Sequence, residues 1–278
     1  MESRATMTVL LISRGSMSGG QIIARCLAHR AGFTCLTRED LFAAVNNHGE
    51  IATKVMASIE KATRDYQRFS ELRRPYKILM RLALLEYARR GNLAYFGYCG
   101  HLLVEGISHF IKVRLVAPVD LRVKTTMERL RCNKEEALDF IHRVDEERAS
   151  WARFVYGKNL CDPALYDVCI NMGRLSFDGV CSLLNLITQE KEYQPTEESL
   201  AALENLYLAT MVEAALVVEP KTFAFELGAT ASNGKVLLEG PYLDDPERSL
   251  VVETAASVPG VVSVDYQPGY APNLEYLP

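Results

Sequence analysis

The sequence predicts an α/β protein with a parallel sheet, followed by a small α+β module. Two observations support this fold class: short apolar strands alternate with helical patterns over the first part of the chain, and the rhythm changes after a polar stretch. Strands that alternate with helices are typical of a parallel sheet covered on both faces. We therefore expect a first domain at 1–190, a linker at 191–197, a second domain at 198–268 and an extended tail at 269–278.

The first domain opens with a strand, a glycine-rich loop and a helix. Residues 8–13 form a continuous apolar run, residues 14–20 are rich in glycine and serine, and residues 21–30 carry an apolar stripe at helical spacing. Proline favours the first position of a helix, and serine favours the position just before it. The later elements are expected to be a helix at 76–90, strands at 93–96 and 113–117, a helix starting at Pro118, a charged helix at 134–153, a strand at 168–171 and a helix capped by Ser176.

The second domain has the pattern αββαβ. Asn233-Gly234 is a residue pair that favours a tight hairpin turn. Around it we expect a helix at 198–218, strands at 222–227 and 235–240, a helix at 246–257 and a strand at 261–265.

Composition excludes several classes of protein. The chain has 278 residues, 49% hydrophobic content and a formal net charge of −4, which is typical of a globular protein and does not indicate a nucleic-acid partner. No uninterrupted apolar run approaches the ~18 residues of a membrane span, and the N-terminus lacks a signal-peptide pattern. We therefore expect a cytoplasmic protein without membrane contact. The seven cysteines show no C-x-x-C pair and the five histidines no metal-ligand spacing, so we expect reduced thiols and no protein-bound metal.

Three features are candidates for chemistry. The loop at 14–20 enters a helix N-terminus, a geometry that suits phosphate, but it lacks the pattern G-x-x-x-x-G-K-[ST] and is equally compatible with a tight strand–helix turn. Three arginines recur every five residues in 141–157; one straight helix turns them about 500° per step, so they would converge only if the segment bends. The alternative is a solvated, charged helix. Asp162 and Asp167 would orient a ligand or simply cap turns.

Four segments together resemble a known family. They occur in the order ISRGSMSGGQIIA, KVRLVAPVDLRVKTTMER, HRVDEERASWARFVYG and DPALYDVCINMGRLS. These segments are similar to the cytidylate-kinase-like family, a branch of the nucleoside monophosphate kinases, over about residues 7 to 188. NLAYFGYCGHLLVEG matches its central strand and the loop after it. The resemblance implies a P-loop NTPase-type fold with a helical lid, and ATP-dependent phosphoryl transfer to a pyrimidine nucleoside monophosphate such as CMP, with Mg²⁺ held by the nucleotide phosphates.

The resemblance also implies roles for individual residues. It assigns Arg143, Arg148 and Arg153 to the catalytic lid, Arg14, Ser16, Ser18, Gly19 and Gly20 to phosphate binding, and Arg38, Asp145 and Asp167 to the acceptor nucleotide. The chain departs from the family at three points. Met17 replaces a loop glycine, Gly20 replaces the lysine, and Tyr98-Cys99 stands where related kinases often carry an arginine. An alternative is therefore a weak or inactive pseudokinase that acts as a nucleotide sensor or assembly subunit.

The second domain resembles a BON domain through NG-x-V-x-L-x-G, a helix and V-x-G-V-x-x-V. This resemblance implies binding, often at membranes or to small ligands, rather than catalysis, and we expect a protein partner or a second copy of the chain through this domain. The alternative is a self-contained packing or dimerisation module. Asp244, Asp245 and Glu247 disfavour attraction to anionic lipid.

Overall fold

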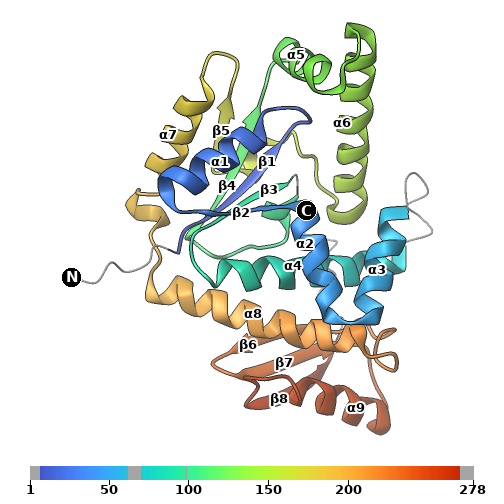
Figure 1. Ribbon diagram of the computed structural model, residues 1–278. Coiled ribbons are helices and arrows are strands. Elements are labelled where there is room, and N and C mark those ends of the chain that lie inside the picture. The colour runs from blue at the N-terminus through green and yellow to red at the C-terminus, as the bar shows by residue number, and fades with distance from the viewer. Residues whose placement is uncertain (1–6, 62–69, 98, 270–278) are drawn as a thin grey trace. The chain divides into compact units, whose positions relative to one another are not determined.

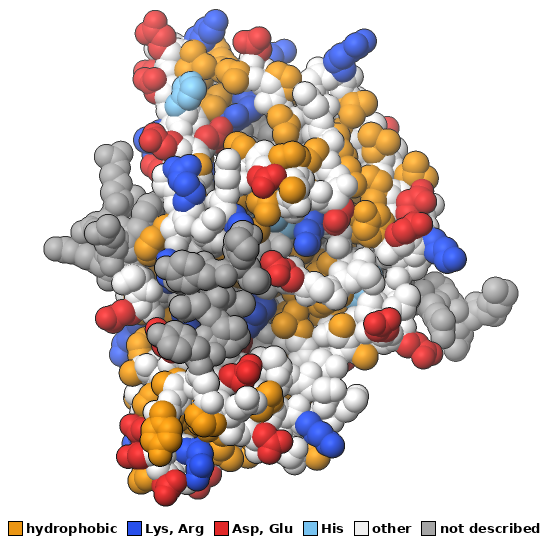
Figure 2. All heavy atoms as spheres, turned by 180° about the vertical axis from the view of Figure 1, so that it is seen from behind, with side chains coloured by type: hydrophobic (Ala, Val, Ile, Leu, Met, Phe, Trp, Pro, Cys, Tyr) orange, Lys and Arg blue, Asp and Glu red, His pale blue; other side chains and the backbone are white. Residues whose placement is uncertain are grey.

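The computed structural model describes residues 7–61, 70–97 and 99–269. The chain divides into two compact units: Met1–Asp40 with Arg90–Ser199, and Leu41–Arg89 with Leu200–Pro278. Figure 1 shows the helices and strands of both units. Figure 2 shows that acidic and basic side chains are interspersed over one face. The predicted domain boundary at 191–197 remains a prediction. Tyr98 and residues 270–278 of the expected tail lie outside the described residues.

The first unit contains a five-stranded sheet in the order β2-β3-β1-β4-β5, and every neighbouring pair is parallel. The parallel α/β sheet predicted from the sequence is therefore confirmed. The four residues from Val9 to Ile12 in the central strand are at most 1% exposed, which explains their continuous apolar run. The strands are β1 (Val9–Arg14), β2 (Thr34–Thr37), β3 (Leu93–Gly97), β4 (Phe110–Val116) and β5 (Val168–Asn171).

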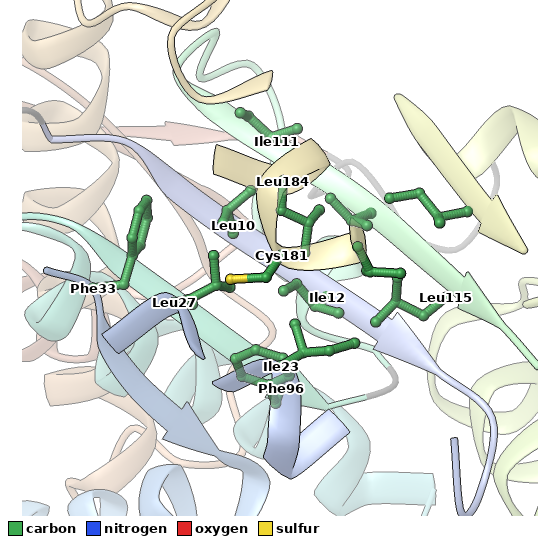
Figure 3. Close-up of a cluster of buried hydrophobic side chains, with 14 of the residues drawn as sticks. Leu10, Ile12, Ile23, Leu27, Phe33, Phe96, Ile111, Leu115, Cys181 and Leu184 are labelled. Atoms are coloured by element: carbon green, nitrogen blue, oxygen red, sulfur yellow. The ribbon is translucent and has the colours of Figure 1, made fainter. Parts of the chain in front are cut away.

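Helices α1 (Gly20–Ala31) and α7 (Phe177–Ile187) lie together beside one face of this sheet (Figure 1). Ser176 caps α7 as expected, because its hydroxyl accepts a hydrogen bond from the Gly179 N–H at 3.0 Å. The apolar stripes of both helices are buried against alternate strand residues in one cluster (Figure 3). This cluster fixes the start of α1, and with it the loop that leads out of β1.

Cys26 of α1 and Cys181 of α7 form a disulfide across a sequence separation of 155 residues. The expectation of reduced thiols throughout is therefore wrong for this pair. Sequence spacing could not identify the pair, because the two cysteines meet only when both helices pack on the same sheet face. Cys181 lies among Leu10, Leu27 and Leu184 in Figure 3.

The charged helix of the first unit is continuous. α5 (Val119–Leu130) follows Pro118, and α6 (Lys134–Tyr156) starts with a capping box between Asn133 and Glu136. Gly157, with φ 64°, ends α6 in the left-handed conformation that glycine favours. Because α6 runs through without a break, its arginines point in different directions.

The second unit takes its helices from two stretches of the sequence, one before and one after residues Arg90–Ser199 of the first unit. They are the greater part of α2 (Arg38–Val45), then α3 (Glu50–Lys61), α4 (Arg73–Ala88), α8 (Glu197–Val218) and α9 (Asp245–Ala256). Within this unit Arg81 of α4 pairs with Glu213 of α8, and Arg89 pairs with Glu204 at 2.7 Å. Short 3-10 segments elsewhere in the chain are Asn46–His48, Gly100–Leu102, Pro163–Leu165 and Lys191–Tyr193.

The C-terminal strands are β6 (Gly228–Ser232), β7 (Lys235–Gly240) and β8 (Ser263–Pro268), in that order in the sheet. β6 and β7 are antiparallel, β7 and β8 are parallel, and the αββαβ order is confirmed. Asn233 and Gly234 form the turn between β6 and β7 with φ values of 51° and 84°.

The strand expected at 222–227 is wrong. Thr222 and Phe223 both donate backbone hydrogen bonds to Glu219 O, so these residues prolong the end of α8 as a turn. Phe225 and Leu227 still pack into the C-terminal core. The alternation of apolar and polar residues at 222–227 therefore arises from core contacts made by a turn. The spacing of apolar residues alone does not distinguish this case from a strand.

One stretch of the described residues, Lys191–Val218, is long and apolar enough to cross a membrane, but 50% of its most apolar window is buried inside the structure. Core helices pass the same test, so this is weak evidence for a span. From the sequence, Leu206 to Val218 was the longest candidate for a span, and it was excluded because it is too short and carries Glu213.

Candidate phosphate-binding site

The glycine-rich loop occupies the carboxyl end of the central strand. It runs from Arg14 at the end of β1 to Gly20 at the start of α1. Met17 and Gly19 adopt left-handed conformations with φ values of 54° and 76°. A Cβ at Gly19 would lie 2.2 Å from the Phe177 ring, so α7 requires a glycine there. Met17 thus stands at a position whose backbone favours the glycine that the family carries.

Ser16 is the most tightly held residue of this loop. Its N–H and its hydroxyl donate to Oδ1 of Asp145 at 3.1 and 2.9 Å. Arg122 of α5 donates from Nε to the Ser16 carbonyl at 2.8 Å and from Nη2 to the Ser16 hydroxyl at 2.7 Å. The structure therefore joins the loop, α5 and α6 at one serine.

The same arginine also pairs with the lid helix. Arg122 Nη2 lies 2.5 Å from Asp145 Oδ2, and the Arg122 side chain is only 11% exposed. Burial alone would raise the pKa of Asp145, but hydrogen bonds from Arg122 and Ser16 hold that pKa below its usual value. Asp145 is thus a charged carboxylate at the loop.

The side chain of Arg14 lies over Gly20, the position at which other phosphate loops carry a lysine. An ideal Cβ at Gly20 would lie 2.5 Å from both Cδ and Nε of Arg14, so the arginine side chain passes directly over that glycine. Within the described residues, Nε of Arg14 is buried and has no hydrogen-bond partner. Burial, and then the charge of Arg148, lower the pKa of Arg14. A group in this state would gain from a negatively charged ligand.

Only one of the three predicted lid arginines reaches the loop. Arg148 donates from Nη1 to the Arg14 carbonyl at 3.4 Å. Arg143 instead pairs with Glu147 at 3.4 Å on an exposed face, and Arg153 donates to Ser150 at 3.3 Å. Each step of five residues turns about 140° beyond a full circle, which separates these side chains on the straight helix.

The remaining loop residues have structural contacts of their own. The Ser18 hydroxyl donates to the Gly15 carbonyl at 2.9 Å and closes the turn. The Gly15 Cα faces Arg122, since a Cβ there would lie 3.5 Å from the guanidinium carbon.

The two other predicted acceptor residues differ in position: Arg38 follows β2 at the carboxyl edge from which the loop leaves, whereas Asp167 precedes β5. Arg38 is the first residue of α2, and its charge acts on the buried thiol of Cys99. Asp167 precedes β5, and its Oδ2 accepts a hydrogen bond from the Lys112 N–H at 2.7 Å. Because β5 pairs in parallel with β4, Asp167 lies beside Lys112 and level with Leu11 in the middle of β1, whereas the loop leaves the carboxyl end of β1. Asp162 caps a short turn through the Ala164 N–H at 2.9 Å, as the structural alternative proposed.

Sequence interpretation missed Arg122 and a second polar group at this sheet edge. Ser13 Oγ accepts hydrogen bonds from Arg114 Nη1 at 2.8 Å and Tyr166 Oη at 3.3 Å. The His101 ring lies 4.6 Å from the Tyr166 ring, and burial, aided by Lys112 and Arg114, lowers the His101 pKa to about 3. The sequence offered one signal for this group, which is Arg114 within the apolar strand β4.

Metal ligands are scarce in the described residues, which contain no group of three histidine, cysteine or acidic side chains placed to hold a metal ion. Gln21 stands where phosphate loops supply a hydroxyl to the metal, and both oxygens of Asp145 already accept hydrogen bonds. These residues fit a metal that arrives on a ligand better than one held by the protein alone.

Comparisons with solved structures found several similar chains, of which the first supports this fold. An uncharacterized protein from Eubacterium ventriosum aligns with TM-score 0.51 and 17% identity, over 66% of this chain and 99% of that one. Shikimate kinase from Bacteroides thetaiotaomicron aligns with TM-score 0.40 and 13% identity, over 66% and 99%. Thymidylate kinase from Candida albicans aligns with TM-score 0.36 and 12% identity, over 66% and 92%. No curated protein shows significant sequence similarity.

The parallel sheet, its flanking helices and the loop after its central strand share the fold of the Eubacterium ventriosum protein, and a small three-stranded sheet follows C-terminally. The sequence description of the cytidylate kinase-like family matches residues 9–174, more than half of the chain. That range includes the loop and the helices that carry Arg122, Asp145 and Arg148. The chain therefore belongs to the cytidylate kinase-like family.

Proposed function

We propose that this protein is a nucleotide kinase that transfers the γ-phosphoryl group of ATP to a pyrimidine nucleoside monophosphate such as CMP. One observation carries the proposal: Arg14, Arg122 and Arg148 surround a glycine-rich loop at the carboxyl end of the central strand. Family membership supports the nucleotide kinase class. The location we propose is the cytoplasm.

Catalysis of phosphoryl transfer depends mainly on positioning the two substrates and on neutralising the charge of the phosphates. In our proposal Arg14 supplies the charge that a lysine gives in other phosphate loops, and Arg148 approaches the transferring phosphoryl group from α6. Ser16, Ser18, Gly19 and Gly20 shape the phosphate cradle, and Arg38 and Asp145 contact the acceptor. Bound Mg²⁺ would arrive on the ATP phosphates and neutralise part of their charge.

The test is purified protein with ATP, Mg²⁺ and a panel of nucleoside monophosphates, with nucleoside diphosphate measured as product. Formation of CDP or UDP above a protein-free control is expected. If no acceptor yields a diphosphate while a parallel assay with a known nucleotide kinase does, the enzymatic proposal fails.

A second candidate is a pseudokinase that senses nucleotide or serves as an assembly subunit. Met17 in a left-handed conformation and the absence of a loop lysine favour it. Calorimetry distinguishes the versions, since a sensor binds nucleotide without turnover and a structural subunit binds none. The BON-like interpretation of the C-terminal module, with a protein partner or a second copy bound to it, remains part of this proposal.

A further inference from the structure

The protein's own Asp145 occupies a built oxyanion subsite at the loop. Three donors converge on its carboxylate: the Ser16 N–H at 3.1 Å, the Ser16 hydroxyl at 2.9 Å and Arg122 Nη2 at 2.5 Å. Counted over the whole residue, Ser16 is 2% exposed and Arg122 is 9% exposed, so these donors are largely buried. A buried set of N–H and O–H groups with a guanidinium is suited to any planar or tetrahedral oxyanion.

The charge around this subsite is unbalanced. Arg14, Arg122 and Arg148 lie at the loop, whereas two carboxylates act on these cations: Asp145, which the loop and Arg122 bind directly, and Glu39, whose charge acts on Arg14. Arg14 keeps a buried Nε without a hydrogen-bond partner, and its pKa is lowered. A phosphoryl group carries more negative charge than one carboxylate and has additional acceptor oxygens, so it would satisfy this set of cations better.

We propose that Asp145 is an internal counter-anion of the empty site, and that a phosphoryl oxyanion replaces it on Ser16 and Arg122. This inference rests on the proposed function only in taking the phosphoryl group to belong to a nucleotide. Arg122, which no motif singled out, becomes a ligand-binding residue of the loop. Asp145 cannot bind Ser16 and an acceptor at the same time. Phosphoryl binding at the loop would therefore release Asp145, and with it the contact that holds α6 to the loop.

The chain contains a probe for that release. Trp151 is the single tryptophan, it lies six residues after Asp145 on the same helix, and it is 7% exposed. When Asp145 leaves Ser16 and Arg122, α6 loses this tie to the loop. Quenching of Trp151 emission by acrylamide should then increase.

The experiment compares the full-length wild type, Asp145→Asn and Glu146→Gln. Glu146→Gln removes the same charge one residue away, from an exposed side chain. Pyrophosphate without metal, and ATP with Mg²⁺, are titrated by calorimetry and by Trp151 quenching. We expect Asp145→Asn to bind pyrophosphate about tenfold more tightly than wild type, since a competing charge at hydrogen-bond distance is gone. Glu146→Gln should bind as wild type does.

Quenching tests the inference apart from the function. Stronger quenching in ligand-free Asp145→Asn than in Glu146→Gln supports the tie even when no nucleotide binds, in which case only the proposed function fails. In the wild type, saturating pyrophosphate should increase quenching, an outcome that does not depend on how well the variant folds. Unchanged or weaker pyrophosphate binding by Asp145→Asn, or protection of wild-type Trp151 by pyrophosphate, overturns the inference. If Trp151 quenching increases at a lower concentration of ATP than of pyrophosphate, a nucleotide is the source of the phosphoryl group. If both ligands act at the same concentration, the source is the free oxyanion.

Discussion

The side chain of Arg14 lies directly over the Cα of Gly20, so that a Cβ at residue 20 would be 2.5 Å from Arg14 Nε. This relationship gives the glycine a physical role. A side chain at residue 20, such as the lysine of other phosphate loops, would require the Arg14 side chain to move from this position.

Replacing Arg14 by Ala should weaken nucleotide binding by at least about tenfold, because a phosphate loses its nearest cation. The same change should leave the unfolding midpoint nearly unaltered, since burial opposes the charge of Arg14 in the empty protein. Calorimetry with ATP and thermal unfolding measure the two effects. Arg25→Ala, an exposed arginine on α1, is the control and should change neither.

The three lid arginines should differ in effect. Arg148→Ala should lower turnover by about a hundredfold or more, as expected when a phosphate-contacting arginine is lost. Arg143→Ala and Arg153→Ala should retain most turnover, because these side chains pair with Glu147 and Ser150 on α6. Steady-state rates with the acceptor that the nucleoside monophosphate panel identifies provide the measurement. Equal losses in all three variants would show that α6 bends on binding nucleotide.

Met17→Gly should raise the free energy of unfolding by about 1 kcal/mol, because Met17 has φ 54° and glycine adopts this conformation without steric cost. Urea unfolding measures the change. Met17→Ala retains the Cβ and should bring no such gain. Gly19→Ala should be destabilising, since its Cβ would meet the Phe177 ring. A loss of stability in Met17→Gly would mean that the methionine side chain contributes more packing than its backbone costs.

The disulfide between Cys26 and Cys181 should contribute to stability because it closes a loop of 155 residues. Loop-closure entropy sets the contribution at up to about 5 kcal/mol. Thermal unfolding with and without reductant should therefore show a lower midpoint under reducing conditions. Cys26→Ser should unfold at one temperature in both buffers. Mass spectrometry of alkylated protein gives an independent check, and alkylation of both cysteines without reductant would contradict the pairing.

His101 should make stability depend on acid pH. Its pKa is about 3 in the folded protein, below the unfolded value of 6.5, because burial disfavours the imidazolium. The unfolded chain therefore binds a proton first as pH falls, and stability is full above pH 6.5 and declines between pH 6.5 and about 3. Each pH unit in that window costs up to about 1.4 kcal/mol. His101→Phe keeps an aromatic ring beside Tyr166 and should flatten the decline, as measured by urea unfolding at several pH values. An unchanged slope would place the acid sensitivity elsewhere.

Local patterns predicted much of the fold because the physics behind them is local. The apolar run at 8–13, the N-cap at Ser176 and the Asn233-Gly234 turn all depend on neighbours in the chain. The short strand β2 and helix α2 were not predicted, since their patterns are brief or carry little periodicity. Helix α3 was not predicted either, although its apolar residues recur at helical spacing. Thr222–Leu227 shows the opposite failure, an alternating pattern whose backbone bonds back to α8.

The candidate site divides in the same way. The sequence by itself determined that a glycine-rich loop joins a buried strand to a helix, and that arginines are concentrated in a later helix. Only the tertiary structure decided that Asp145 meets Ser16 across 129 residues, that Arg148 alone of the three predicted lid arginines reaches the loop, and that Asp167 lies level with the middle of β1. The physical reason is that backbone preference is set by adjacent residues, whereas the meeting of distant side chains depends on strand order and on the phase of a straight helix.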